Sequence, residues 1–461
     1  MPRRHVVGQR ALSHILLTSQ PPKRQRRNGP NTFLPSAQTF STASSSSSSS
    51  SSSLSPSSSE KHKNKNKSPA RPPDPLPLEG ITVVSLEQAI AAPLCTRQLA
   101  DQGARVIKVE RPGTGDFARA YDARARGLSS HFVWVNRSKE SLALDLKRPR
   151  DMAALRKLLA RADVLVQNLA PGASARLGLS WEDLEPTHGR RGLVLCDISG
   201  YGEGGPYEGR KAYDLLVQGE AGFMSVTGKP GRGGMAKVGA PVADIAAGTS
   251  AYGGILAALL RRARTGRGSR VDVSMLESAA EWMGFPLYYG MDGAAPPERA
   301  GASHSAVYPY GPFATGGDDG TVMLGVQNER EWLRFCDEVL GDSRLAADER
   351  FRDNSLRSRN RDELRAIIED AFSGSSSGQV LARLDAAGIA NGQVNDVGAL
   401  WEHPQLRARG RWTEVDTEVG KMPALLPVGA ASGEDVRMGR VPALGEHNDK
   451  IFKELGIDID G

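Results

Sequence analysis

The sequence of 461 residues predicts an α/β protein with a mostly parallel sheet in one large domain and a smaller α+β domain beside it. Short runs rich in β-branched residues alternate with helical stretches from residue 81 onward, which is the pattern of crossover units on a parallel sheet. This alternation lapses between residues 286 and 320, where Gly and Pro accumulate. We therefore expect a domain boundary in that segment.

The elements of the large domain follow one another in a regular order. Each expected strand is short and is followed by a polar or Gly-rich loop. Ligands of open α/β sheets bind outside the carboxyl ends of the strands, so the chemistry is expected in these loops. We expect strands at residues 81–85, 104–110, 163–168 and 193–199, and helices at residues 93–102 and 151–161.

A weakly polar run at residues 245–260 is interrupted by Gly, Ser and Thr and is shorter than the roughly 20 apolar residues that cross a bilayer. It predicts a buried helix and no insertion into a membrane.

The second part of the chain has a different pattern, with helices grouped after a single strand. We expect a strand at residues 321–326, helices at residues 329–340, 361–372 and 379–387, a strand at residues 412–416 and a last helix at residues 448–455. The expected organisation is a large domain at 78–290, a linker at 291–320, a small domain at 321–402 and a final segment at 403–461. No internal repeat has a fixed period.

Most of the positive charge lies in the first 77 residues. They hold twelve Lys or Arg against Glu60 and Asp74, a net of +10, so the remainder carries −4 of the chain's +6. A mildly acidic body gives no support for a nucleic-acid partner. The basic segment before residue 60 lacks Asp and Glu and surrounds a short apolar stretch, which is typical of a mitochondrial presequence.

Two other interpretations of this segment are a basic tail on a cytoplasmic protein and a nuclear signal at residues 23–27. A serine run at 44–53 and a Pro-rich stretch at 72–77 bury too little apolar surface to order a chain. We expect residues 1–77 to be a disordered leader and linker, and the folded protein to begin near Leu78.

Cysteine and histidine usage argues against two classes of site. Cys95, Cys196 and Cys336 are far apart and form no CxxC pair, and the eight histidines are scattered. Neither a disulfide framework nor a structural metal site is therefore expected, and a reducing compartment fits best.

The sequence GYGEGG at residues 200–205 satisfies GxGxxG after an expected strand. A dinucleotide-binding fingerprint needs its third glycine in the first turn of a helix, whereas Pro206 follows here at once. No GxxxxGK[ST] phosphate loop occurs anywhere in the chain. The sequence therefore gives no support for nucleotide-dependent redox chemistry or for ATP hydrolysis.

Basic and amide side chains lie where several strand-end loops are expected, namely Arg111, Arg137, Lys139, Asn168 and Arg176. Taken singly, each is most simply a solvated surface residue. If the loops meet at one edge of the sheet, the same residues form a cationic rim for a phosphorylated ligand, because guanidinium groups bind phosphate oxygens in a fork.

Several stretches of the chain, in this order, resemble the class III CoA-transferases, also called the CaiB/BaiF or formyl-CoA transferase family. The resemblance covers roughly residues 78–458. It rests on LEQAIAAPLCTRQLADQGARVIKVERPGTGD, VNRSKESLALDLK, ADVLVQNLAPGASARLGL, ISGYGEGGPY, AYDLLVQGEAG, PVADIAAG, ALLRRARTGRGSRVDVSMLE and YPYGPF.

This resemblance implies a fold, a partner and a site. It implies a Rossmann-like large domain built from both chain ends, and a homodimer of two interlocked chains. The nucleophile implied for the AYD-type motif is Asp214. The implied CoA-binding residues are Gln88, Ala89, Arg111, Asn136, Arg137, Ser138, Lys139, Asn168, Leu169, Ala170 and Arg176.

The implied chemistry is covalent catalysis by a carboxylate. Asp214 attacks an acyl-CoA thioester to give an aspartyl-acyl anhydride, and the released CoA thiolate returns to form an aspartyl-CoA thioester. A free carboxylic acid then attacks this enzyme thioester, or exchanges through a second anhydride, and leaves carrying the CoA while the aspartate is regenerated. Each intermediate keeps the activation of the first thioester, so we expect no bound cofactor and no metal, with CoA and acyl-CoA as substrates only. Without this family context, Asp214 reads as a helix N-terminal carboxylate.

Two alternatives come from the same residues. The α-methylacyl-CoA racemases of this superfamily carry a His before the Asp of the motif, where this chain has Tyr213, a poor base at neutral pH. Their second Asp matches Asp244, so half of that machinery is present. A CoA-binding protein without catalysis is the other alternative, and the retained Asp214 argues against it. We favour the transferase.

The segment at residues 301–313 bears on the acceptor. It resembles the branch that handles dicarboxylic acids such as glutarate, hydroxymethylglutarate, citramalate, mesaconate and itaconate. His304, Tyr308 and Tyr310, with Tyr213, are candidates to hold a carboxylate, although ordinary packing in a linking loop is the simpler explanation of the first three. With a mitochondrial leader, succinyl-CoA is the expected donor.

Overall fold

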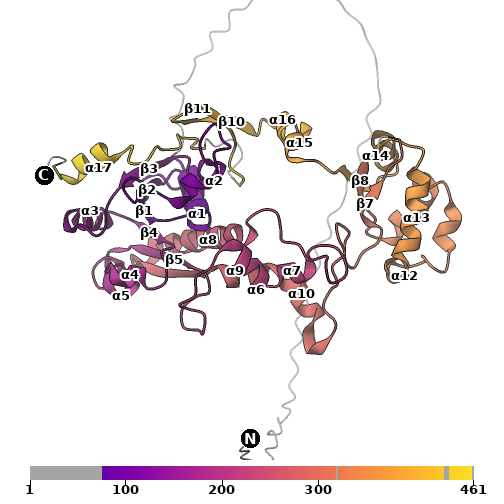
Figure 1. Cartoon of the computed structure of the whole chain (residues 1–461), viewed down its shortest axis with the longest axis horizontal. Coiled ribbons are helices and arrows are strands. Elements are labelled where there is room, and N and C mark those ends of the chain that lie inside the picture. The colour runs from indigo at the N-terminus through magenta and orange to yellow at the C-terminus, as the bar shows by residue number, and fades with distance from the viewer. Residues whose placement is uncertain (1–74, 318–319, 430–435, 459–461) are drawn as a thin grey trace, which may run out of the picture. The chain divides into compact units, whose positions relative to one another are not determined.

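The computed structural model describes residues 75–317, 320–429 and 436–458. The expected leader, apart from residues 75–77, lies outside them. The first part of the chain forms a six-stranded parallel sheet in the order β3-β2-β1-β4-β5-β6 (Figure 1). Its strands are β1 (Thr82–Leu86), β2 (Arg105–Glu110), β3 (Lys139–Ala143), β4 (Val164–Gln167), β5 (Val194–Ser199) and β6 (Ser269–Ser274). The predicted mixed α/β fold is confirmed, and the strand order is that of a Rossmann sheet.

Both faces of the parallel sheet are buried, because consecutive strand residues point to opposite sides. Val83 belongs to an apolar cluster with α1 (Ala91–Asp101), α8 (Val242–Thr265) and α9 (Met275–Trp282). Its neighbour Val84 belongs to the cluster on the other face, with α3 (Pro149–Leu159) and α17 (Asn448–Leu455). The last helix therefore packs beside α3 and β3 (Figure 1), so both ends of the folded chain build this domain.

Helix α8 is the long apolar helix that the sequence indicates, and it is long and apolar enough to cross a membrane by length and composition. Here it packs on α1, α9 and β6. Gly248 permits the close contact with α1, because a Cβ atom at this position would lie 2.6 Å from the carbonyl oxygen of Ala91. The first turns of α1 and α8 are thereby brought together.

The smaller unit is built on a three-stranded antiparallel sheet of β7 (Tyr310–Ala314), β8 (Thr321–Gly325) and β9 (Ala390–Gln393). Strand β7 lies inside the segment 291–320 that we expected to link the domains, and it pairs with β8 along its whole length. The helices of this unit are α11 (Glu329–Arg334), α12 (Asn354–Arg359), α13 (Arg361–Phe372) and α14 (Ser377–Ala386), and a π-helical turn at Phe335–Val339 continues α11.

A hairpin of β10 (Trp412–Thr417) and β11 (Gly420–Leu425) follows the smaller unit. Its Val415 packs with Phe132 and Val441. The remaining helices are short: α2 (Ser130–Val135), α4 (Ala173–Arg176), α5 (Trp181–Leu184), α6 (Asp214–Glu220), α7 (Phe223–Val226), α10 (Gly284–Tyr289), α15 (Val397–Trp401) and α16 (Pro404–Ala408).

The glycine-rich stretch at 200–205 does not open a helix. The loop after β5 runs on to Tyr213 before α6 begins. The geometry therefore lacks the helix N-terminus that a pyrophosphate fingerprint requires.

Candidate active site

Asp214 is the first residue of α6, and its carboxylate caps the start of a second helix. Its Oδ1 accepts hydrogen bonds from the backbone N–H of Ala243 at 2.8 Å and of Asp244 at 3.3 Å, both in the first turn of α8. Unpaired N–H groups at a helix start stabilise a negative charge. The structure thus holds the candidate nucleophile in one orientation.

The second oxygen of Asp214 is held by a residue that the sequence analysis missed. The side chain of Gln218 donates from Nε2 to Asp214 Oδ2 at 2.7 Å, and its Oε1 accepts from the backbone N–H of Val238 at 2.9 Å. Gln218 is fully buried one turn after Asp214 on α6. The available signal was this i, i+4 spacing within the AYDLLVQGEAG stretch.

Asp244 lies beside Asp214 at the start of α8. Burial, and then the charge of Asp214, raises the pKa of Asp244 from its ordinary 3.8 to about 7, against a lowering hydrogen bond from the backbone of Ala91 at the start of α1. The raised pKa of Asp244 favours its protonated form beside Asp214. The sequence indicated both residues, and the structure brings them together.

Two tyrosines flank this carboxylate pair. Tyr213 precedes α6 and is 61% exposed. Burial raises the pKa of Tyr121, and the charges of Asp116 and Asp244 raise it further. The nearby Tyr213 adds to this increase in the pKa of Tyr121. The ring of Tyr121 contacts His131 edge-on at 5.3 Å, and His131 Nδ1 lies 2.9 Å from Asp122 Oδ2. No motif in the sequence marked Tyr121 or His131.

The expected CoA loops after β1 and β4 are joined to each other. The backbone N–H of Gln88 donates to Asn168 Oδ1 at 2.8 Å, and Asn168 Nδ2 donates back to the carbonyl oxygen of Gln88 at 2.9 Å. This contact lies where the strand order reverses between β1 and β4, the usual ligand position in such sheets. Leu169 and Ala170 follow directly, and the exposed Arg176 ends α4.

The loop of residues 136–139 is mostly buried. Arg137 donates from Nε and Nη2 to the two carboxylate oxygens of Asp101, each at 2.8 Å. Lys139 has no exposed surface and donates to Glu87, to the carbonyl oxygen of Pro93 and to Asn136 Oδ1. Ser138 bonds to the backbone of Arg437 and Gly439, which fixes the returning C-terminal segment.

The expected cationic rim is therefore divided by the structure. Arg111, directly after β2, and Arg176 are exposed. Arg137 and Lys139 are committed to buried ion pairs. Of these four predicted cations, only Arg111 and Arg176 present a charge to an external phosphate.

The three candidate acceptor residues have different surroundings. His304 Nδ1 accepts from the backbone N–H of Ala306 and of Val307, each at 3.0 Å, so this nitrogen carries no proton. The His304 ring stacks on Tyr310 with centroids 5.2 Å apart, and the side chain is exposed. Tyr308 is 1% exposed, and its hydroxyl has no hydrogen-bond partner among the described residues. His304 is thus exposed and Tyr310 half-buried, whereas Tyr308 is a core residue.

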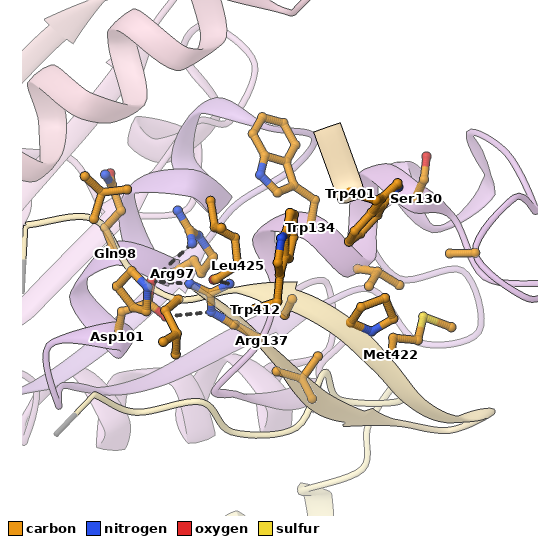
Figure 2. A pocket seen from close by; sticks show the side chains of 18 of the residues that line it. Arg97, Gln98, Asp101, Ser130, Trp134, Arg137, Trp401, Trp412, Met422 and Leu425 are labelled. Carbon is orange, nitrogen blue, oxygen red and sulfur yellow. Dashed lines mark hydrogen bonds and ion pairs between the residues drawn. The ribbon is translucent and has the colours of Figure 1, made fainter. Parts of the chain in front are cut away.

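A cavity of about 750 Å³ lies between α1, α2 and the β10–β11 hairpin (Figure 2). Three tryptophans and an ion-paired floor shape it, and its lining includes Arg97, Asp101, Trp134, Arg137, Trp401 and Trp412. Of the predicted site residues only Arg137 lines it. This cavity is therefore separate from the carboxylate pair. Within the described part of the chain, no group of three His, Cys, Asp or Glu residues is arranged to hold a metal ion.

The sequence model of CoA-transferase family III matches residues 78–448. Human succinyl-CoA:glutarate CoA-transferase is 32% identical over 382 residues, covering 82% of this chain and 86% of that protein. The succinate–glutarate CoA-transferase of Agrobacterium fabrum (strain C58) is 34% identical over 388 residues, covering 82% of this chain and 96% of its own. A CaiB/BaiF family protein of Brucella suis has a similar solved structure, with a TM-score of 0.73, 32% identity and coverage of 83% of this chain and 100% of that chain. The chain therefore belongs to CoA-transferase family III and is an enzyme of that class.

Proposed function

We propose that this enzyme moves CoA from succinyl-CoA to a second small dicarboxylic acid, with Asp214 as the nucleophile. The observation that carries the proposal is the carboxylate of Asp214, which two α8 amides and the buried Gln218 hold in one orientation. The names of the human and Agrobacterium relatives, which pair succinyl-CoA or succinate with glutarate, support this substrate class.

The proposed reaction uses the carboxylate twice. Asp214 attacks the thioester carbonyl, a C–O bond forms, and the C–S bond breaks to release CoA as a thiolate. The thiolate then attacks the aspartyl carbonyl of the anhydride and expels the first acid as its carboxylate. The acceptor carboxylate attacks the aspartyl-CoA thioester, which forms a second anhydride and releases the CoA thiolate. The thiolate then attacks the acceptor's carbonyl in this anhydride, forms the new acyl-CoA and expels the Asp214 carboxylate. The backbone amides of residues 200–205 are candidates to stabilise the oxyanions.

For the CoA site, we propose that Arg111 and Arg176 bind the phosphate groups and that the turn at Gln88 and Ala89 with Asn168 contacts the remainder. Exposure of both guanidinium groups supports this role. The buried residues Asn136 to Lys139 contribute by fixing the neighbouring loop.

For the acceptor site, we propose the Nε2–H group of His304, because two backbone amides occupy its other ring nitrogen. A carboxylate accepts a hydrogen bond from such a fixed donor. Tyr310 supports the ring by stacking, and the exposed hydroxyl-bearing Tyr213 is a second candidate.

We also propose a mitochondrial homodimer. Large apolar side chains are exposed along α10, including Phe285 at 60%, Leu287 at 61% and Tyr288 at 75%. An exposed apolar face of this kind favours association with a second copy. Light scattering during size-exclusion chromatography should give twice the chain mass, and a monomer mass would contradict the proposal.

The nucleophile is tested by comparing the wild-type enzyme with Asp214→Ala. Incubation with succinyl-CoA and glutarate, itaconate or citramalate, followed by mass spectrometry, should show transfer by the wild type only. Residual activity above about one per cent would remove Asp214 from the nucleophile role. Hydroxylamine trapping with acyl-CoA should label the peptide that contains Asp214.

A parallel incubation of a 2-methylacyl-CoA in heavy water tests the racemase alternative, which the position of Asp244 beside Asp214 favours. We expect no deuterium at the α-carbon, because Tyr213 replaces the expected base. Deuterium uptake without CoA transfer would replace the transferase assignment, and binding without either reaction would favour the non-catalytic alternative.

A further inference from the structure

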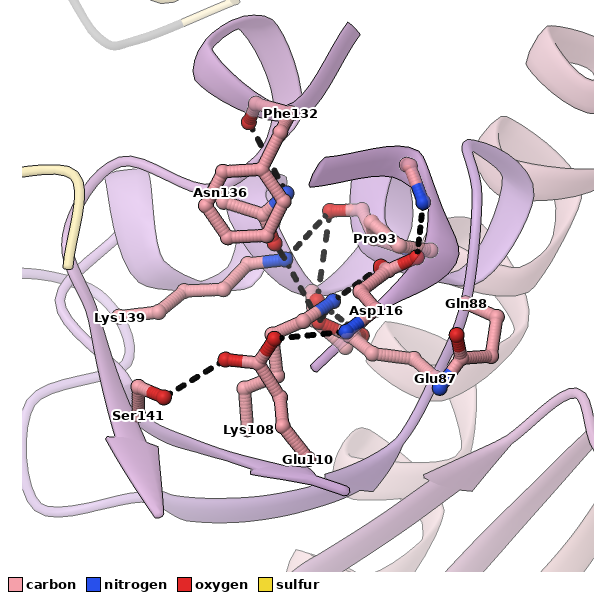
Figure 3. A network of polar contacts seen from close by, with 12 residues as sticks. Glu87, Gln88, Pro93, Lys108, Glu110, Asp116, Phe132, Asn136, Lys139 and Ser141 are labelled. Carbon is pink, nitrogen blue, oxygen red and sulfur yellow. Dashed lines mark hydrogen bonds and ion pairs between the residues drawn. The ribbon is translucent and has the colours of Figure 1, made fainter. Parts of the chain in front are cut away.

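A buried network of charges adjoins Gln88 (Figure 3), and one of its members, Asp116, hydrogen-bonds the backbone of Ala89. Glu87, the residue directly after β1, lies between two lysines whose side chains have no exposed surface. Its Oε1 is 3.3 Å from Lys108 Nζ and 2.8 Å from Lys139 Nζ. Lys108 also binds Asp116 Oδ2 at 2.7 Å.

The network holds three carboxylates and three cations, and each is ion-paired. Lys108 pairs with Glu87 and Asp116, Lys139 pairs with Glu87, and Arg119 pairs with Glu110. A hydroxyl of Thr96 donates to Glu87 and a hydroxyl of Ser141 donates to Glu110, each at 2.6 Å. Buried ion pairs are often no more stabilising than apolar side chains of the same shape, so stability alone does not explain such a set.

The second oxygen of Asp116 connects the network to the turn. Asp116 Oδ1 accepts from the backbone N–H of Ala89 at 3.1 Å and of Ala118 at 2.9 Å. Ala89 has a φ of +63°, a left-handed conformation that is unfavourable for a residue with a Cβ atom. The turn therefore keeps its shape only while its neighbours hold it.

Two more sets of hydrogen bonds hold the Gln88–Ala89 turn. The side chain of Gln88 accepts at Oε1 from the backbone N–H of Phe117 at 3.1 Å. The side chain of Asn168 hydrogen-bonds both the backbone N–H and the carbonyl oxygen of Gln88. The turn leads directly into α1, whose Ala91 hydrogen-bonds Asp244. Through the start of α1, the turn thus connects the proposed CoA site with the carboxylate pair.

We propose that Asp116, anchored by the buried Lys108, is a positioning residue for the reaction. It holds the Ala89 amide, and through it the Gln88–Ala89 turn, in the conformation that receives the acyl-CoA. This inference rests on the proposed function, because the turn is assigned there to CoA binding. A role confined to stability would leave CoA affinity unchanged in any variant that still folds.

The test is the double variant Lys108→Met/Asp116→Leu, which removes the acceptor of the Ala89 amide without leaving a buried charge alone. The matched control is Arg262→Met/Asp163→Leu. Asp163 also accepts a strand amide, that of Thr82 at 2.8 Å, and pairs with Arg262 at 2.8 Å. This control pair lies at the amino ends of the strands, away from the turn.

We expect the KM for acyl-CoA to rise at least tenfold in the Lys108→Met/Asp116→Leu variant, with the KM for the acceptor acid changed less than threefold. Hydrogen exchange of the peptide containing Ala89 should become faster in the same variant. Both quantities should stay within twofold of wild type in the control. Calorimetric titration with free CoA, performed in an Asp214→Ala background, should show the same loss of affinity without relying on turnover.

An unchanged CoA affinity in the folded double variant would overturn the proposal. If that variant does not show cooperative unfolding, Asp116→Asn replaces it, since it keeps the volume and weakens the anchor to Lys108, and the same two readouts apply. Failure of the nucleophile assignment is a separate outcome, because it appears as turnover by Asp214→Ala while the CoA titration still reports on the turn.

Discussion

Replacing Asp244 by Asn should change how the stability of the enzyme depends on pH. The folded structure raises the pKa of Asp244 from 3.8 to about 7, so the native state binds a proton more tightly than the unfolded chain. This contribution to stability is fully present below about pH 4 and is lost as the pH rises through 7. At pH 8, where Asp244 is ionised in both states, the free energy of unfolding is therefore lowered by the full cost of ionising Asp244 in the folded state.

The magnitude follows from the width of that window. Each pKa unit corresponds to about 1.4 kcal/mol, so a shift of roughly three units amounts to about 4 kcal/mol between pH 4 and pH 7. Because the side chain is partly exposed, water screens its interaction with Asp214, and we expect about half of this value, roughly 2 kcal/mol. Asp244→Asn cannot ionise and should lose this dependence.

The assay is urea unfolding of the wild type and Asp244→Asn at pH 5, 6, 7 and 8. The wild type should lose more free energy of unfolding than the variant across this range, by about 1 to 2 kcal/mol. Asp214→Asn should show part of the same effect, since it removes the second cause of the shift but not the burial of Asp244. Parallel curves for wild type and Asp244→Asn would refute the reasoning.

Three further outcomes are expected. Gln218→Leu, which keeps the volume but removes the donor to Asp214, should lower kcat at least tenfold without changing the KM for acyl-CoA; a normal kcat would mean that the α8 amides suffice. Arg111→Ala and Arg176→Ala should each weaken CoA binding by about 1 to 3 kcal/mol in calorimetry, and the arginine that binds the 3′-phosphate should show little further loss with dephospho-CoA. A chain beginning at Leu78 should turn over like the full chain, while a fluorescent fusion without the leader should stay in the cytosol; mitochondrial signal from that fusion would contradict the targeting role.

Local patterns in the sequence predicted the order and type of the principal elements, although many of the short helices and several strands were not predicted. The helices expected at residues 361–372 and 448–455 have these bounds in the structure, and the four predicted parallel strands begin and end within two residues of their predicted positions, whereas β3 and β6 were not predicted. Periodicity encodes which side of a segment is buried, and that property depends on neighbouring residues alone. The family assignment came from eight stretches in order, and the role of Asp214 as nucleophile, which this resemblance implies, stays a prediction.

Only the tertiary structure decided which charges are available. Lys139 and Arg137 read as free cations in the sequence, yet their partners Glu87 and Asp101 lie 52 and 36 positions earlier in the chain. Strand β7 likewise formed in a Gly- and Pro-rich segment because β8 supplied its hydrogen bonds. Whether a lysine binds a ligand or holds a loop is set by the strands that fold beside it, and a pattern of adjacent residues carries no record of those contacts.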